Sequence, residues 1–181
     1  MKKIILLCLF FMNLAYGYEY NSLLLKAQAS IFPKIMLLDK KIEEKLVDAK
    51  IIYTIVYDKD DYDTALFIYE LINEKYKGRF DQYAYRINLV EFSDFSSETQ
   101  ASAIYILNSG ENIKTAADIA REKGIISFSY DINNLKHGLL FSLMLEKSTV
   151  LYINKENLYT QKVDFVDALL QMVRFIDNDN S

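Results

Sequence analysis

Cysteine, histidine, proline and tryptophan are almost absent from this chain of 181 residues, which has one Cys, one His, one Pro and no Trp. The single cysteine, Cys8, and the single histidine, His137, do not make up the ligand sets of zinc, haem or iron–sulfur sites. One cysteine and one histidine also provide few residues for catalysis by a thiol nucleophile or by a Ser-His-Asp triad. We therefore expect a protein with no enzymatic activity, no metal and no cofactor.

The segment richest in information is the N-terminus. Lys2–Lys3 gives it a positive start, an unbroken apolar run extends from Ile4 to Met12, and Ala15–Gly17 forms a small-x-small site. The apolar run is too short to span a bilayer, and this layout is typical of a secretory signal peptide. The sequence therefore predicts a cleaved signal peptide over residues 1–17 and a periplasmic protein over residues 18–181.

Removal of this segment changes the composition of what remains. Cys8 leaves with it, and lipidation at Cys8 is disfavoured because Leu6 and Leu7 precede it instead of small residues. Two lysines leave and no acidic residue does, so the net charge falls from −4 to −6. With no basic cluster in the remaining chain, nucleic acid and anionic membranes are disfavoured as partners.

Glycine is also scarce, with five residues in the chain, and there is no proline-rich linker or internal repeat, so we expect one domain. The apolar periodicity predicts helices and strands in alternation. The predicted helices cover about residues 21–46 (with Pro33 kinking or splitting it), 64–77, 113–123 and 163–176, and the predicted strands cover 50–57, 83–92, 101–107, 125–130, 139–145 and 150–153. Asn21-Ser22 can cap the first helix, and the third helix has a packing stripe of Ala116, Ala117 and Ala120 and ends at Gly124.

This alternation predicts an α/β fold with a mostly parallel sheet and helices on both faces, Rossmann-like or flavodoxin-like in layout. The last two strands are joined by Glu146-Lys147-Ser148, which predicts a late antiparallel hairpin at the edge of the sheet. The strand 139–145 is apolar at nearly every position. We expect the C-terminal helix to cover it, with an exposed contact patch as the alternative.

The loop after strand 50–57 argues against nucleotide binding. It contains Asp58, Asp60 and Asp61 and no glycine, so a phosphate would be repelled and could not approach the backbone. Calcium loops need a glycine at the bend and a distal glutamate, and neither occurs at the required spacing. We interpret the acidic run as a solvated loop in which Asp61 or Asp63 caps the next helix.

A stronger candidate is the loop after strand 101–107, because backbone amides between a buried strand and a helix can face a ligand at the carboxyl edge of the sheet. An ordinary turn with an N-cap is the simpler interpretation of the same residues. Tyr130 and Asp131 follow the next strand, and His137 can titrate near pH 6.5. Tyr18 and Tyr20 are candidate partner contacts. The candidate ligand- or partner-binding residues are Asn108, Ser109, Gly110, Asn112, Tyr130, Asp131 and His137.

From about residue 24 to 176, the chain resembles the YfiR-like family of periplasmic proteins. The similarity is carried by AIYILNSGENI, TAADIAREKG, IISFSYD, the glycine-led hairpin GLLFSLMLEKSTVLYINKENL and the ending LLQMVRFI, and Asn154 falls on an asparagine typical of the second hairpin strand. The chain departs from the family in having one glycine, Gly138, before the hairpin. It also lacks the cysteines that some members use, so the resemblance does not extend to redox control.

The resemblance implies a small α/β domain that binds the outer part of a membrane signalling protein, often a diguanylate cyclase, and restrains it. It brings no catalytic residues, and a homodimer stays among the possible states. The alternative is a small-molecule binding protein of a transport or sensing system, although most of these have two lobes. A secreted hydrolase is disfavoured, because His137 is the only imidazole and no G-x-S-x-G sequence is present.

Overall fold

A computed structural model describes residues 18–110 and 112–177 of the protein. The predicted signal peptide, residues 1–17, lies outside the described residues. Within the described part, no helix combines the length and apolar character needed to cross a membrane.

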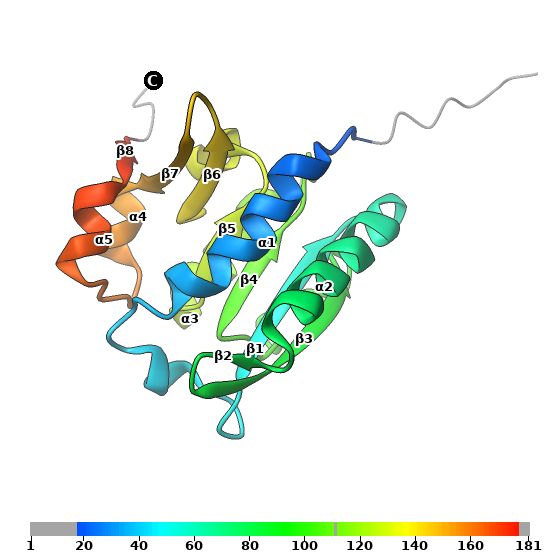
Figure 1. The fold of residues 1–181 in the computed structure, drawn as a ribbon, viewed down its shortest axis with the longest axis horizontal. Coiled ribbons are helices and arrows are strands. Elements are labelled where there is room, and N and C mark those ends of the chain that lie inside the picture. The colour runs from blue at the N-terminus through cyan, green and yellow to red at the C-terminus, as the bar shows by residue number, and fades with distance from the viewer. Residues whose placement is uncertain (1–17, 111, 178–181) are drawn as a thin grey trace, which may run out of the picture.

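The described residues form one sheet with helices on both faces (Figure 1). The strands lie in the order β2-β3-β1-β4-β5-β6-β7-β8. Their bounds are β1 Ile51–Tyr57, β2 Arg79–Phe80, β3 Tyr83–Glu91, β4 Ala103–Ile106, β5 Ile126–Ser129, β6 Phe141–Leu145, β7 Thr149–Asn154 and β8 Arg174–Ile176. The helices are α1 Ser22–Met36, α2 Tyr62–Tyr76, α3 Ile113–Lys123, α4 Lys155–Thr160 and α5 Asp167–Met172, and short 3₁₀ helices occur at η1 Ile42–Lys45, η2 Lys59–Asp61 and η3 Ile132–His137.

The five strands β3, β1, β4, β5 and β6 are parallel, whereas β6 and β7 form an antiparallel hairpin. Numbered along the chain, the parallel strands follow the order 2-1-3-4-5 of flavodoxin-like folds. Every residue of β1, β4 and β5 is buried, as expected for continuous apolar strands in a covered parallel sheet. The predicted fold class is therefore confirmed.

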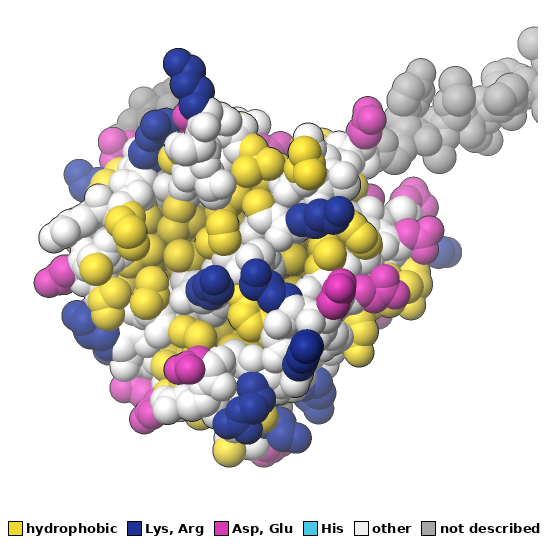
Figure 2. All heavy atoms as spheres, viewed as in Figure 1, with side chains coloured by type: hydrophobic (Ala, Val, Ile, Leu, Met, Phe, Trp, Pro, Cys, Tyr) yellow, Lys and Arg dark blue, Asp and Glu magenta, His cyan; other side chains and the backbone are white. Residues whose placement is uncertain are grey.

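Two apolar cores lie on opposite faces of this sheet. On one face α1 and α2 pack over the strands, and Phe32 of α1 stacks on Phe128 of β5 with 4.5 Å between ring centroids. On the other face α3 packs through Ile113, Ala116, Ala117 and Ala120, the alanine stripe that its sequence predicts. On the first face, Figure 2 shows apolar side chains gathered in a hollow between α1 and α5.

The first helix differs from the prediction at its C-terminal end. Asn21 caps α1 as expected, since its side chain accepts hydrogen bonds from the N–H groups of Leu23 and Leu24. The helix ends at Met36 and not near residue 46, because the following segment turns and forms η1. Pro33 lies buried inside α1 and does not split it.

The C-terminal region also corrects the prediction of one helix over residues 163–176. The structure has the shorter helix α5, and Arg174–Ile176 form strand β8, parallel to β7. The hairpin is therefore not the edge of the sheet, because β8 lies outside it. Arg174 holds this edge by donating hydrogen bonds to both carboxylate oxygens of Glu146 and to the hydroxyl of Tyr152. The helix α4, capped by the side chain of Asn154, was not predicted.

The apolar strand that the sequence places at 139–145 is covered for most of its length. Phe141 and Leu143 are fully buried in the core beneath α1, and Phe165 meets Phe141 edge-to-face at 5.1 Å. Only its C-terminal end emerges, where Leu145 is 41% exposed. This confirms coverage of the strand, although α1 and the segment before α5 provide it instead of one long C-terminal helix.

Candidate functional site

The strand order creates a crevice at the carboxyl edge of the sheet. After β1 the chain crosses through α2 to β3 on one side, whereas β4 pairs with β1 on the other side. The loops that follow β1 and β4 therefore diverge, and folds of this kind bind ligands at such a switch point. In this protein the described residues of the two loops are 58–61 after β1 and 107–110 and 112 after β4.

Tyr20 fills this crevice. Its hydroxyl donates a hydrogen bond to Oδ2 of Asp61 at 2.7 Å and accepts one from the backbone N–H of Asn108 at 3.0 Å. Asp61 belongs to the loop after β1 and Asn108 to the loop after β4, so one phenol hydroxyl bridges both sides of the switch point. Because a hydroxyl both donates and accepts, it satisfies a carboxylate and an amide at the same time.

Two further tyrosines surround Tyr20, and we call Tyr18, Tyr20 and Tyr130 the tyrosine cluster. The ring centroids are 4.9 Å apart for Tyr18 and Tyr20, 4.8 Å for Tyr20 and Tyr130, and 5.8 Å for Tyr18 and Tyr130, with tilted or edge-to-face geometry. The Tyr18 hydroxyl donates to Oδ2 of Asp131 at 3.3 Å, and the N–H of Asn21 donates to the Tyr130 hydroxyl at 2.8 Å. The segment 18–21 thus touches the loops after β1, β4 and β5.

Burial and nearby carboxylates raise the pKa of the Tyr18 and Tyr20 phenols and hold both in their protonated form. Burial and then the Asp61 carboxylate raise the pKa of Tyr20 far above its ordinary value. Burial and the Asp131 carboxylate raise the pKa of Tyr18 to about 12. Burial also raises the pKa of Asp61, with Asp58 and Asp60 adding to this and the hydrogen bond from Tyr20 opposing it. At neutral pH both tyrosines are hydrogen-bond donors.

The structure brings most of the predicted site residues to this edge. Tyr130 and Asp131 contact the segment 18–21 directly, and Asn108 contributes its backbone amide. Ser109 is buried, and its hydroxyl accepts a hydrogen bond from Nδ2 of Asn112 at 3.3 Å. Asn112 occupies the position before α3 but makes no side-chain cap hydrogen bond. Gly110 is exposed in the same loop.

His137 is not part of this crevice. It ends η3 and is exposed in a separate hollow, which is also lined by Arg121 and Asn157. The expected N-cap from Asp61 or Asp63 is also wrong. Asp61 occupies the position before α2 without a side-chain cap hydrogen bond, and Asp63 lies inside the first turn. Oδ2 of Asp61 instead accepts a hydrogen bond from Tyr20. The Tyr20–Asp61 pair joins residues 41 positions apart, and no local pattern in the sequence indicates it.

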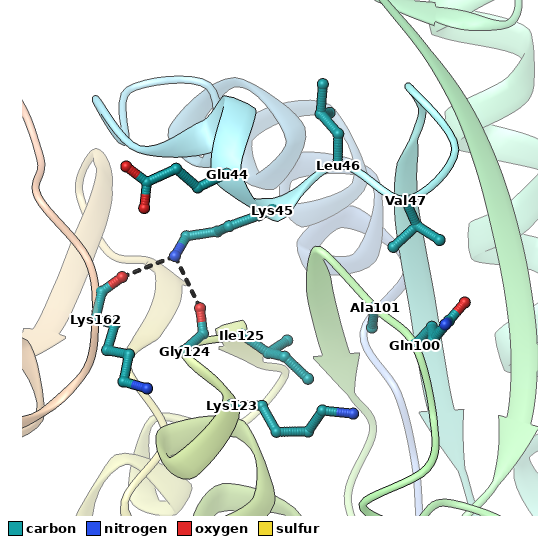
Figure 3. A pocket seen from close by; sticks show the side chains of 10 residues that line it. All are labelled: Glu44, Lys45, Leu46, Val47, Gln100, Ala101, Lys123, Gly124, Ile125 and Lys162. Carbon is teal, nitrogen blue, oxygen red and sulfur yellow. Dashed lines mark hydrogen bonds between the residues drawn. The ribbon is translucent and has the colours of Figure 1, made fainter.

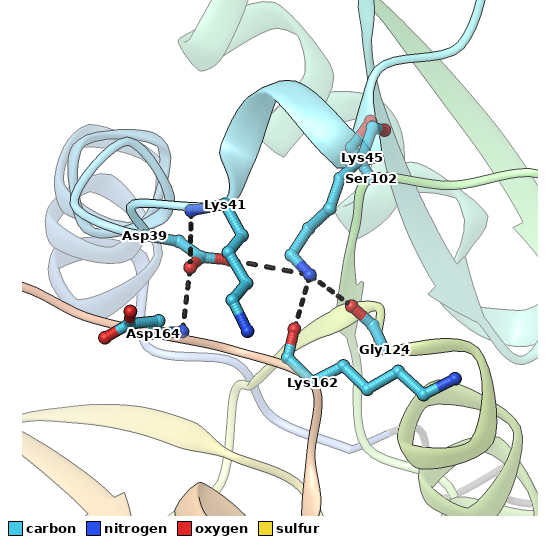
Figure 4. Close-up of polar contacts among 7 residues, drawn as sticks. All are labelled: Asp39, Lys41, Lys45, Ser102, Gly124, Lys162 and Asp164. Atoms are coloured by element: carbon cyan, nitrogen blue, oxygen red, sulfur yellow. Dashed lines mark hydrogen bonds and ion pairs between the residues drawn. The ribbon is translucent and has the colours of Figure 1, made fainter.

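A second polar cluster lies at the opposite, amino-terminal edge of the sheet. A hollow of about 340 Å³ is lined there by residues of η1 and of the turn after α3 (Figure 3). Nζ of Lys45 donates to the carbonyl oxygens of Gly124 and Lys162 at 2.9 and 2.7 Å and lies 3.5 Å from Oδ2 of the buried Asp39 (Figure 4). The ammonium thus makes two hydrogen bonds to backbone carbonyls and an ion pair with Asp39, so the cluster connects η1 to the segments after α1, α3 and α4.

No family model and no curated protein matches the chain. Among solved structures, a conserved domain protein from Vibrio cholerae O1 biovar El Tor str. N16961 is similar, with a TM-score of 0.56 and 14% identity over 83% of this chain and 59% of that one. The ABC domain in complex with L-Trp from Streptococcus pneumonia has a TM-score of 0.52 and 10% identity over 79% of this chain and 60% of that one. At this identity, the similarity concerns the fold. In each case the chain spans about three fifths of the other protein.

Within the described residues, no group of three or more His, Cys, Asp or Glu side chains is placed to hold a metal ion.

Proposed function

We propose that this protein is a periplasmic, non-enzymatic regulator of the YfiR-like kind, which binds the outer part of a membrane signalling protein such as a diguanylate cyclase and restrains it. The observation that carries the proposal is the occupation of the switch-point crevice by Tyr20 of the same chain. A side chain of the same chain thus occupies part of the position where this fold takes a small ligand, and this favours recognition of a protein surface.

Exposed apolar side chains border the same edge and support this proposal. Tyr18 is 43% exposed, Leu23 in the first turn of α1 is 65% exposed, and Tyr62 at the start of α2 is 47% exposed. Aromatic side chains with one polar end are enriched where proteins meet one another. The apolar side chains gathered between α1 and α5 are a second apolar surface (Figure 2). Binding would act by population shift, because a regulator that prefers the inactive partner increases its population.

The test is the cellular level of cyclic di-GMP in the organism that encodes the chain. Deletion should raise this level, and re-expression of the wild-type protein should restore it. A Leu23→Asp/Tyr62→Asp variant should fail to restore it, because two charges disrupt the apolar rim. Tyr159→Asp is the matched control, since Tyr159 is 75% exposed on α4, away from this edge. An unchanged level after deletion, with the protein expressed beforehand, excludes a cyclase as the partner.

The alternative function is binding of a small molecule, and one observation favours it. A small ligand that displaced Tyr20 would meet an amide and a carboxylate between the diverging loops, and one similar structure is described as an ABC domain in complex with L-Trp. Calorimetric titration of the purified protein with L-Trp distinguishes the two functions. Saturable heat that is lost in an Asp61→Ala variant would favour ligand binding.

A further inference from the structure

We propose that the switch-point crevice is a binding site for a tyrosine side chain, which the segment 18–21 occupies in cis and a tyrosine of a partner protein can take over. This deepens the proposed function, since it concerns the same edge of the sheet and names the chemical group that is recognised. The ligand class follows from the groups that line the crevice.

The crevice selects a hydroxylated aromatic ring. The Asp61 carboxylate requires a donor and the Asn108 amide requires an acceptor, and they meet at one atom, the Tyr20 hydroxyl, at 2.7 and 3.0 Å. The Tyr130 ring lies edge-to-face against the bound ring at 4.8 Å. An aliphatic alcohol would satisfy the two polar groups without this aromatic contact, and a plain aromatic ring would leave both polar groups unpaired.

The walls of the crevice are held by contacts that do not depend on Tyr20. The carbonyl oxygen of Tyr130 accepts a hydrogen bond from the fully buried Gln28 at 3.0 Å. The side chain of Asn108 accepts one from Nδ2 of Asn134 at 3.3 Å, and the N–H of Asp61 donates to the carbonyl of Asp58 at 2.7 Å. The site is therefore preorganised for a phenol, a property that lowers the cost of binding.

The attachment of Tyr20 to the rest of the chain permits its displacement by another tyrosine. Residues 18–20 belong to no helix or strand, and Tyr18 is 43% exposed. The first turn of α1 is capped by the side chain of Asn21, so α1 does not need the Tyr20 contacts for its own start. A partner's tyrosine can therefore displace Tyr20 without melting α1 or the sheet.

The test deletes the Tyr20 side chain by mutation and then adds phenol as a free ligand. Tyr20→Ala deletes the ring and hydroxyl but keeps Cβ, and phenol supplies the deleted atoms. The variant should bind phenol at least ten times more tightly than the wild-type protein or a Tyr159→Ala control does, with a shift of the Asn108 amide resonance. Benzene should bind at least ten times more weakly than phenol. A peptide with the sequence of residues 18–21, Tyr-Glu-Tyr-Asn, should displace phenol.

Two results would overturn the proposal: equal phenol affinity in Tyr20→Ala and Tyr159→Ala, or benzene binding as tightly as phenol. If Tyr20→Ala does not fold alone, phenol must restore its native amide spectrum, and failure to do so also rejects the site. These measurements use purified protein, so they can fail while the cyclic di-GMP test succeeds, and the reverse.

Discussion

At the scale of single residues, Lys45 joins parts of the chain that lie far apart in sequence. Its ammonium reaches Gly124 after α3, Lys162 after α4 and the Asp39 carboxylate after α1. The Lys45 side chain is 10% exposed and that of Asp39 is fully buried. Oδ1 of Asp39 accepts hydrogen bonds from the backbone N–H groups of Lys41 and Asp164. The buried carboxylate therefore has partners from three segments of the chain. Loss of one member of a buried pair leaves an uncompensated charge.

We therefore predict that Lys45→Met lowers the free energy of unfolding by about 3 kcal/mol. Lys40→Met is the matched control, because Lys40 pairs with Asp164 at 3.2 Å with both side chains about half exposed. This exposed pair should contribute under about 1 kcal/mol. Urea denaturation of both variants measures the difference. Equal losses in the two variants would contradict the role of Lys45.

At the scale of elements, the two ends of α3 show what local sequence can predict. Its bounds, its buried stripe and its stop at Gly124 match the prediction, because helical periodicity and a C-terminal glycine are local signals. The prediction for the region after β7 is wrong, because there the structure depends on pairing with a distant segment. Val173 and Ile176 continue the apolar spacing of α5, yet pairing with β7 places Ile176 in a strand. Pairing between distant segments overrides the local pattern.

Gly124 packs closely against Lys162, in the segment that follows α4. Its φ is +69°, and an added Cβ would lie 2.9 Å from Cβ of Lys162. Gly78 after α2 has a φ of +90° with nothing within 4 Å of the same position. Gly78→Ala should lower stability by about 1 kcal/mol from backbone strain alone. Gly124→Ala should lower it by roughly 2 kcal/mol or more, since the contact adds to the strain. Thermal and urea unfolding of both variants measure the two losses of stability. Equal losses would contradict the close contact at Gly124.

At the scale of the whole molecule, tyrosines in the core link stability to alkaline pH. Tyr53 and Tyr105 are fully buried, and burial raises the pKa of each well above the ordinary value. The folded protein thus holds these phenolic protons more tightly than the unfolded chain does. Stability is fully present below about pH 10, the unfolded tyrosine pKa, and is lost as the pH rises above it.

We predict that part of the tyrosine absorbance change at 295 nm appears only together with loss of the folded circular dichroism signal. Tyr53→Phe tests the cause, because the Tyr53 hydroxyl is buried without a hydrogen-bond partner. Its removal should leave stability at pH 7 unchanged or higher and should move the alkaline transition to higher pH. Ionisation of every tyrosine near pH 10 with an intact fold would refute the link.

The amino-acid sequence alone predicts the fold class, the parallel strands β1, β4 and β5, the hairpin β6–β7 and the helix α3. Each depends on hydrophobic periodicity, turn residues and caps within a short window. It also indicated Asn108, Tyr130 and Asp131 as residues of one edge, because parallel strands end together. Three features follow from the packing of distant segments instead: Tyr20 enters the crevice between Asp61 and Asn108, His137 lies elsewhere, and β8 forms the edge of the sheet. These contacts join residues 22 to 88 positions apart, and they depend on how the packed elements meet in space.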